Sequence, residues 1–154
     1  MDEFLVNHGL LALFCLSFLA STLIPLGSEW LLVALLIKGH DQTMTVLAAT
    51  VGNTLGAWTT YLIGMWGSSF ILFNILRMKD HERLRAEILF KRYGAWSLLF
   101  SWLPVIGDPL CLVGGILRVR PVQFLALVFC GKLARYVAVG MLTLKMMQYS
   151  NGAG

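Results

Sequence analysis

The sequence repeats itself at an interval of 79 residues, and each copy carries an acidic residue inside an apolar segment that proline interrupts. Glu29 follows Pro25 by four residues, and Asp108 follows Pro104 by four residues. The match continues 27, 28 and 31 residues after each proline, where Gly52, Asn53 and Gly56 correspond to Gly131, Lys132 and Arg135. Interrupted apolar segments at corresponding places in two halves indicate a binding site near the centre of a bilayer.

The composition also favours a bilayer. Hydrophobic residues make up 58% of the chain and charged residues 13%, and the mean hydropathy is +0.76. A soluble fold of this size could not bury so much apolar surface, so we expect one integral membrane domain over residues 1–154. The net charge of +4 does not indicate nucleic-acid binding, because the basic residues adjoin apolar segments, where they orient membrane proteins.

Patterns typical of an enzyme or a metal site are missing from the sequence. It has no glycine-rich phosphate loop, Ser-His-Asp set or hydrolase pair of carboxylates in a credible context. Its histidines and cysteines lack metal-ligand spacing. We therefore expect no catalytic residue, metal or cofactor. Asp2 and Glu3 stand where a cleavable signal peptide would carry positive charge, so no such signal is expected.

Two of the apolar blocks have the wrong length for simple membrane spans. The block 4–37 has 34 residues and one charge, whereas one span needs about 20 residues and two spans with a turn need about 40. The block 94–117 is interrupted at its centre in the same way. Each should form a hairpin that enters and leaves by one membrane face, with arms about 12 to 18 Å long. The residues expected at the two tips are Pro25, Gly27, Pro104, Gly107 and Pro109.

Two further blocks, 44–66 and 121–144, are long enough to cross the membrane. The segment 77–93 between them is amphipathic and rich in basic residues, which predicts a helix on the cytoplasmic surface. The chain would thus consist of a first repeat (4–76), this surface helix, a second repeat (94–145) and a short tail (146–154). Because a single crossing separates the hairpins, they should enter from opposite faces, as in an inverted repeat.

The charged residues of the two repeats are the candidate site. Glu29 and Asp108 are each expected about 12 to 14 Å from opposite faces, and so near the centre. Lys132 and Arg135 lie three apart on one helix face, so they could neutralise the carboxylates or bind a phosphate while the carboxylates accept protons. Asn53 corresponds to Lys132 and is a candidate contact to a head group. The alternative is a set of ion pairs that only fixes helix packing.

The remaining conspicuous residues favour structural roles. Gly52, Gly56 and Gly131 are expected to allow close helix packing. Tyr61 and Tyr136 are expected to make interhelical hydrogen bonds or to anchor the chain at the membrane interface.

In order and spacing, five segments resemble the DedA superfamily of membrane proteins, also called the SNARE-associated or VTT-domain family, and its short YqaA branch most closely. They are Leu23–Glu29, Gly52–Gly56, Lys91–Ala95, Ser101–Asp108 and Gly131–Tyr136. The resemblance implies a multi-pass protein of the bacterial inner membrane with two re-entrant hairpins. It also implies movement of phospholipids or polyprenyl phosphates, often linked to the proton gradient, with the family's acidic hairpin residue at Glu29.

One departure from the family lies in the second hairpin. Many members carry an arginine three residues before the proline and another shortly after it, where this chain has Ser101 and Gly107. Lys132 and Arg135 would then supply the positive charge.

The leading functional hypothesis is a lipid flippase or scramblase whose partner is a membrane lipid with a phosphate-bearing head group. A proton-coupled transporter of a small solute or ion, and a non-transporting assembly or stress-response protein, are the alternatives. No nucleic acid partner is expected, and proton coupling and assembly into a homo-oligomer stay open.

Overall fold

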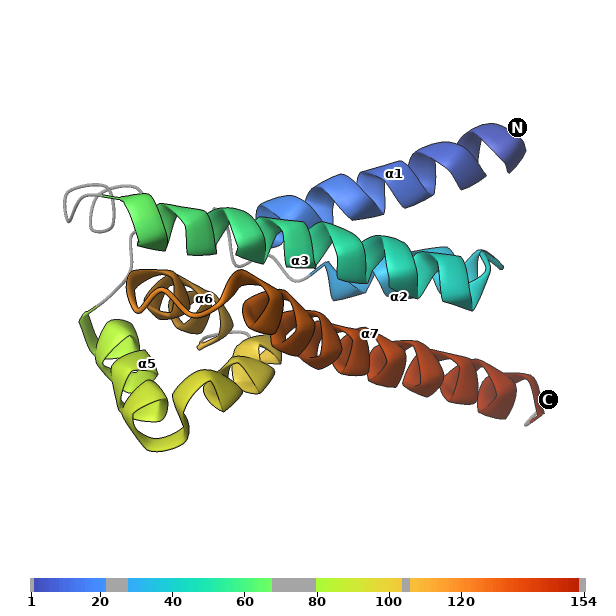
Figure 1. Ribbon diagram of the computed structural model, residues 1–154. Helices are drawn as coiled ribbons and strands as arrows, with labels where there is room; N and C mark the ends of the chain where they lie inside the picture. The colour runs from blue at the N-terminus through green and yellow to red at the C-terminus, as the bar shows by residue number, and fades with distance from the viewer. Residues whose placement is uncertain (1, 22–27, 68–79, 104–105, 153–154) are drawn as a thin grey trace.

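The computed structural model describes residues 2–21, 28–67, 80–103 and 106–152 (Figure 1). All regular elements in these ranges are helices, which confirms the all-α prediction for this part of the chain. The elements are α1 (Asp2–Ala20), α2 (Glu29–Ile37), α3 (Gln42–Trp66), α5 (Asp80–Tyr93), the 3₁₀ helix η1 (Gly94–Trp102), α6 (Gly107–Ile116) and α7 (Pro121–Gly152).

The helix boundaries follow from local chemistry. The Asp41 side chain caps α3 by accepting a 2.8 Å hydrogen bond from the Met44 N–H, and α3 ends where Gly67 turns to extended backbone. Pro121 opens α7, at a helix position where its missing N–H has no cost. At a spacing of 79 residues, α2 corresponds to α6, and the first residue of α3 corresponds to the first residue of α7.

The turns after α2 and α6 have the same structure. Gly39 and Arg118, which are equivalent in the repeat, both have a left-handed backbone, with φ of 86° and 51°. After α2, the N–H groups of Gly39 and His40 donate to the carbonyls of Leu36 and Leu35, respectively. After α6, the N–H groups of Arg118 and Val119 donate in the same way to the carbonyls of Gly115 and Gly114. All four hydrogen bonds are 3.0 to 3.1 Å long. This Schellman arrangement satisfies the last carbonyls of each helix.

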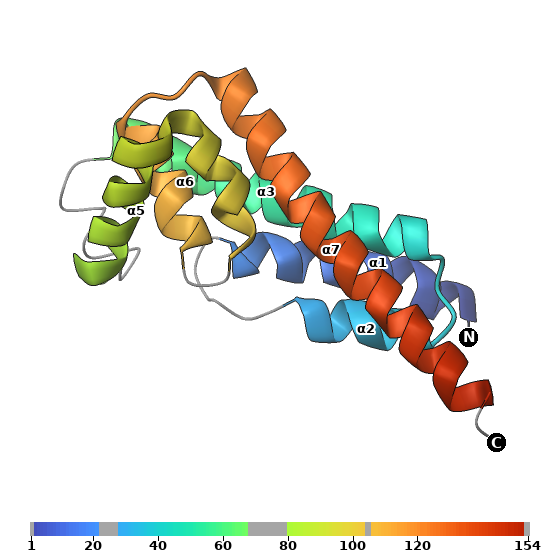
Figure 2. The same ribbon diagram turned by 90° about the horizontal axis from the view of Figure 1, so that it is seen from below.

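The two longest helices, α3 and α7, run antiparallel, and the other helices pack around this pair (Figures 1 and 2). α1 packs along α3 and η1 along α7, whereas α6 packs on α3 and α2 packs on α7. A Cβ atom on Gly52 or Gly56 would strike the backbone of α1, and one on Gly131 would strike the backbone of η1. Glycine at these positions therefore permits the close approach of each long helix to its neighbour.

The helix pairs α1/α2 and η1/α6 approach the α3–α7 pair from opposite ends. Both termini lie at one end of the molecule, and α5 lies across the other (Figures 1 and 2). One apolar core, around Tyr61 and Phe124, fills the half near α5, and a second, around Leu13 and Leu32, fills the half near the termini. The level between the two cores is where the helix pairs meet.

Residues Pro121–Ser150 of α7 form the one helix in the described ranges that is both long and apolar enough to cross a membrane. The 25 residues of α3 extend about 37 Å, which suffices in length; none of them is charged, and most of the polar ones are threonines. Its threonine hydroxyls bond within the helix, as when Thr50 donates to the Val46 carbonyl and Thr54 to the Thr50 carbonyl, both at 2.7 Å. The backbone of α3 thus satisfies much of that polarity.

Two segments differ in detail from the sequence prediction. The arm 94–102 is a 3₁₀ helix, whose larger rise gives it a length of about 18 Å, somewhat longer than an α-helix of nine residues. α7 continues as a helix to Gly152, through most of the segment predicted as a tail. The predicted tip residues Pro25, Gly27 and Pro104 lie outside the described residues.

Candidate functional site

A lysine on α7 is buried at the level where the two helix pairs meet. Lys132 is only 3% exposed, although a charged group buried in protein needs partners to be stable. Its ammonium donates hydrogen bonds to the Ser21 hydroxyl (2.9 Å), to the Asn53 backbone carbonyl (3.2 Å) and to the Asn53 side-chain oxygen. A lysine has three N–H donors, so these contacts occupy all of them.

Ser21 connects this lysine to the second acidic residue. The serine, which directly follows α1, accepts from Lys132 and donates a 3.1 Å hydrogen bond to Oδ1 of Asp108, in the first turn of α6. The positive charge of Lys132 therefore acts on Asp108 through one intervening hydroxyl.

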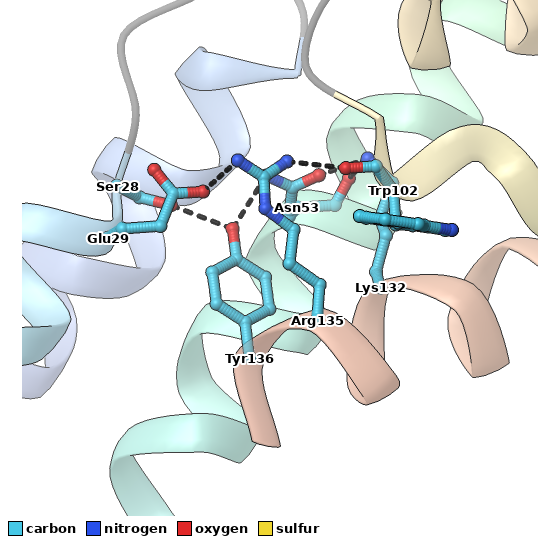
Figure 3. Close-up of polar contacts among 7 residues, drawn as sticks. All are labelled: Ser28, Glu29, Asn53, Trp102, Lys132, Arg135 and Tyr136. Carbon is cyan, nitrogen blue, oxygen red and sulfur yellow. Dashed lines mark hydrogen bonds and ion pairs between the residues drawn. The ribbon is translucent and has the colours of Figure 1, made fainter. Parts of the chain in front are cut away.

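A tyrosine extends the network toward the first acidic residue. The Asn53 amide donates a 2.8 Å hydrogen bond to the Tyr136 hydroxyl, which lies 2.7 Å from the Ser28 hydroxyl (Figure 3). Ser28 immediately precedes α2 and Glu29. The asparagine thus holds Lys132 with its oxygen and Tyr136 with its nitrogen.

The first acidic residue pairs with the arginine. Glu29 forms an ion pair with Arg135, and the arginine also donates a 2.8 Å hydrogen bond to the Trp102 carbonyl at the end of η1 (Figure 3). The side chains of Glu29 and Arg135 are 25% and 23% exposed, in contrast to that of Lys132. Arginine has five N–H donors, and these contacts use two of them. The site is therefore partly accessible to solvent at Arg135 and closed to solvent at Lys132.

The structure brings together all five residues predicted to bind substrate or protons. The contacts form two sets that adjoin because Ser28 precedes Glu29 and Arg135 precedes Tyr136 in the chain. One set contains Asp108, Lys132 and Asn53, and the other contains Glu29 and Arg135. In the described part of the chain the two carboxylates do not touch each other: Glu29 pairs with Arg135, whereas Asp108 is linked to Lys132 through the Ser21 hydroxyl. Asn53 and Lys132, equivalent positions of the repeat, are in direct contact.

The predicted tip residues that the structure describes are buried at the start of α6. A Cβ on Gly107 would strike the Ser101 carbonyl, so glycine allows the chain to turn tightly between η1 and α6. Pro109 is also buried, in the first turn of α6, where proline is tolerated.

Three hydroxyl groups of the network were not predicted as site residues. Ser21 and Ser28 flank the first proline break, and the place of Ser28 next to Glu29 in the sequence is a weak signal. Tyr136 makes the interhelical hydrogen bonds expected of it, as Tyr61 does with the Val119 carbonyl at 2.6 Å, but its position inside the site was missed. Among the described residues, no cluster of histidine, cysteine and carboxylate side chains could hold a metal ion.

Comparison with known proteins agrees with the resemblance seen in the sequence. Residues 9–143 match the VTT domain. The chain belongs to the VTT-domain family. It is 40% identical over 142 residues to the inner membrane protein YqaA of Escherichia coli (strain K12), covering 92% of this chain and 95% of that protein. It is 38% identical over 145 residues to an uncharacterized protein of Haemophilus influenzae, covering 89% of this chain and 88% of that protein.

A more distant relative has a named activity. The undecaprenyl phosphate transporter A of Staphylococcus aureus is 26% identical over 143 residues, covering 85% of this chain and 70% of that protein. No solved structure matches the chain. These similarities assign the chain to the YqaA branch of the DedA/VTT family, as an inner-membrane protein in a family that includes a lipid-related transporter.

Proposed function

We propose that this protein is a lipid flippase or scramblase that moves a phosphate-bearing head group, such as that of a phospholipid or a polyprenyl phosphate, across the inner membrane. The observation that carries the proposal is the network of two carboxylates, a lysine and an arginine at the centre of an otherwise apolar helical protein. Ionisable groups at such depth are costly and mark transport pathways by default. The distant relative named as an undecaprenyl phosphate transporter supports the lipid class.

The proposal includes a membrane arrangement. In it, α1/α2 and η1/α6 are re-entrant hairpins in an inverted repeat, and α3 and α7 are the two crossings. Their approach from opposite ends of the α3–α7 pair supports this arrangement, as do the matching turns after α2 and α6 (Figures 1 and 2). Gly107 and Pro109, at the start of α6, are buried, as polar backbone at membrane depth must be.

Arg135 is the group best suited to hold the phosphate. It is partly exposed and has N–H donors left over from its contacts with Glu29 and Trp102, and a guanidinium matches phosphate oxygens in pairs. Lys132 has no donor left and would instead hold Asn53 and Ser21 in place.

Glu29 supplies a route to proton coupling in this mechanism. A phosphate and the Glu29 carboxylate compete for the same guanidinium, so uptake of a proton by Glu29 would release Arg135 for the head group. Loss of that proton would restore the ion pair and expel the head group. Asp108, held by Ser21 next to Lys132, is the second candidate proton acceptor.

The test is translocation in proteoliposomes of labelled phosphatidylglycerol and of a polyprenyl phosphate, with proton and ion flux measured in parallel. Glu29→Gln and Asp108→Asn should each lower lipid translocation at least about ten-fold, the effect of roughly 1.4 kcal/mol, without loss of membrane insertion. Lys145→Ala, at an exposed position near the C-terminal end of α7 and outside the network, is the control and should retain wild-type transport.

Two results would reject parts of the proposal. Ion flux without lipid movement by the wild-type protein would favour the small-solute or ion transporter. Wild-type lipid transport by both neutral variants would show that the carboxylates only fix helix packing.

A further inference from the structure

Arg118 has a backbone conformation that disfavours a side chain. Its φ of 51° lies in the left-handed region, where the Cβ atom crowds the following carbonyl. The equivalent residue of the first repeat is Gly39, and the hydrogen bonds around the two residues are the same. Glycine adopts this conformation without strain. The turn after α6 therefore does not need an arginine, whose presence calls for a role of the side chain itself.

The surroundings of Arg118 are basic. Arg118 and Arg120 are exposed in the connection between α6 and α7. α5 packs on α6 and lies across the same end of the molecule (Figures 1 and 2). It presents three more exposed basic residues, Arg85, Lys91 and Arg92. We call these five residues the basic end.

Among the described residues of this end, Arg118 and Arg120 contribute most of the net charge. α5 contains four basic and three acidic residues, so its own net charge is only +1, and the two arginines after α6 raise the total to +3. At the far end, the described exposed charges are Lys38, Lys145 and Asp41, whose net charge is +1.

Exposed apolar and aromatic side chains adjoin the basic end. Leu84 and Ile88, one turn apart on α5, are 59% and 54% exposed, although they are large and hydrophobic. Tyr93 and Trp96 are exposed where α5 meets η1. α5 lies across the bundle and combines an apolar strip with basic residues and neighbouring aromatic residues. This combination is typical of a helix that contacts a lipid surface.

We propose that the basic end is a binding site for the head groups of anionic phospholipids, and that Arg118 is retained in its strained conformation because it contacts their phosphate. The charge of the surface complements an anionic leaflet, and each basic residue near such a surface strengthens binding about five-fold. Arginine adds paired hydrogen bonds to phosphate oxygens. This site lies at the end of the molecule and is separate from the buried network around Lys132.

The experiment titrates purified protein in detergent with phosphatidylglycerol, and with phosphatidylcholine as the uncharged comparison. Bound lipid is counted by native mass spectrometry, and the melting temperature is measured without added lipid. Arg118→Gly should bind phosphatidylglycerol about five-fold more weakly. The same variant should melt about 2–4 °C higher, because the strain is removed.

Two controls separate this site from a general charge effect. Arg118→Lys keeps both the charge and the strain but removes the paired hydrogen bonds, so it should bind phosphatidylglycerol more tightly than Arg118→Gly and more weakly than wild type. Lys38→Ala removes one positive charge at the turn after α2, at the opposite end, and should leave phosphatidylglycerol binding unchanged. The inference is overturned if Arg118→Gly binds phosphatidylglycerol like the wild type, or loses no more than Lys38→Ala. Because equilibrium binding is measured, either result is independent of lipid translocation.

Discussion

The contacts of Lys132 lead to a sharp prediction for Lys132→Met. Methionine has a similar length and apolar character, but it removes the ammonium that satisfies the Ser21 hydroxyl and two oxygens of Asn53. Removing one partner of a buried charge interaction costs about 3–5 kcal/mol. Each buried acceptor left without a donor costs about 1–3 kcal/mol, and a loss of several such hydrogen bonds is consistent with that figure. For a chain of this size the melting temperature should fall by roughly 6–20 °C.

The assay is thermal unfolding of purified protein in detergent, followed by loss of soluble monomer. Lys145→Met is the matched control, because it makes the same exchange at an exposed position of the same helix and should change stability by less than about 0.5 kcal/mol. Adding Asp108→Asn to Lys132→Met should recover part of the loss, since the carboxylate then no longer lies buried without its cation. A melting temperature for Lys132→Met within 2 °C of the control, on the order of the measurement error, would refute this account of the network.

Two other predictions address topology and packing. Single cysteines at positions 85 and 118 should react with an impermeant thiol reagent from the same side of the membrane, in a background lacking Cys15, Cys111 and Cys130; labelling from opposite sides would rule out a re-entrant η1–α6 hairpin. Gly115→Ala should destabilise by about 1–3 kcal/mol, because its Cβ would strike the Tyr61 carbonyl, whereas Gly140→Ala faces side chains at 3.4 Å and should be neutral or stabilising by up to about 1 kcal/mol. Equal melting temperatures for the two alanine variants would contradict the packing argument.

The positions of the helices along the chain were largely predictable because they depend on segment length and on interruptions. The block 4–37 is too long for one span and too short for two, and the structure has α1 and α2 on either side of its proline. The 3₁₀ form of 94–102 was not predictable. Its apolar sequence is compatible with either helix type, and the difference depends on how the segment packs against α7.

The charged members of the site and Asn53 were predictable, but the hydroxyl groups that join them were not. A charge in an apolar segment is costly enough to stand out, whereas a hydroxyl such as that of Thr50 can bond to its own helix and has no necessary partner elsewhere. The sequence therefore gave no basis for separating Ser21 from Thr50. The pairing of Arg135 with Glu29 was likewise undetermined, because Lys132 and Arg135 lie on one face and either could approach either carboxylate.

Translocation by Arg135→Lys, measured in proteoliposomes beside the wild-type protein, tests the proposed phosphate-binding role of Arg135 most directly. The exchange keeps the charge but removes the planar fork, so translocation of a phosphate-bearing lipid should fall about ten- to a hundred-fold, as expected for the loss of a hydrogen bond to a charged group. The double variant Arg135→Ala/Glu29→Gln removes both members of the ion pair and should stay inactive while remaining folded. Wild-type translocation by Arg135→Lys, or recovery of activity in the double variant, would show instead that Arg135 serves only to balance Glu29.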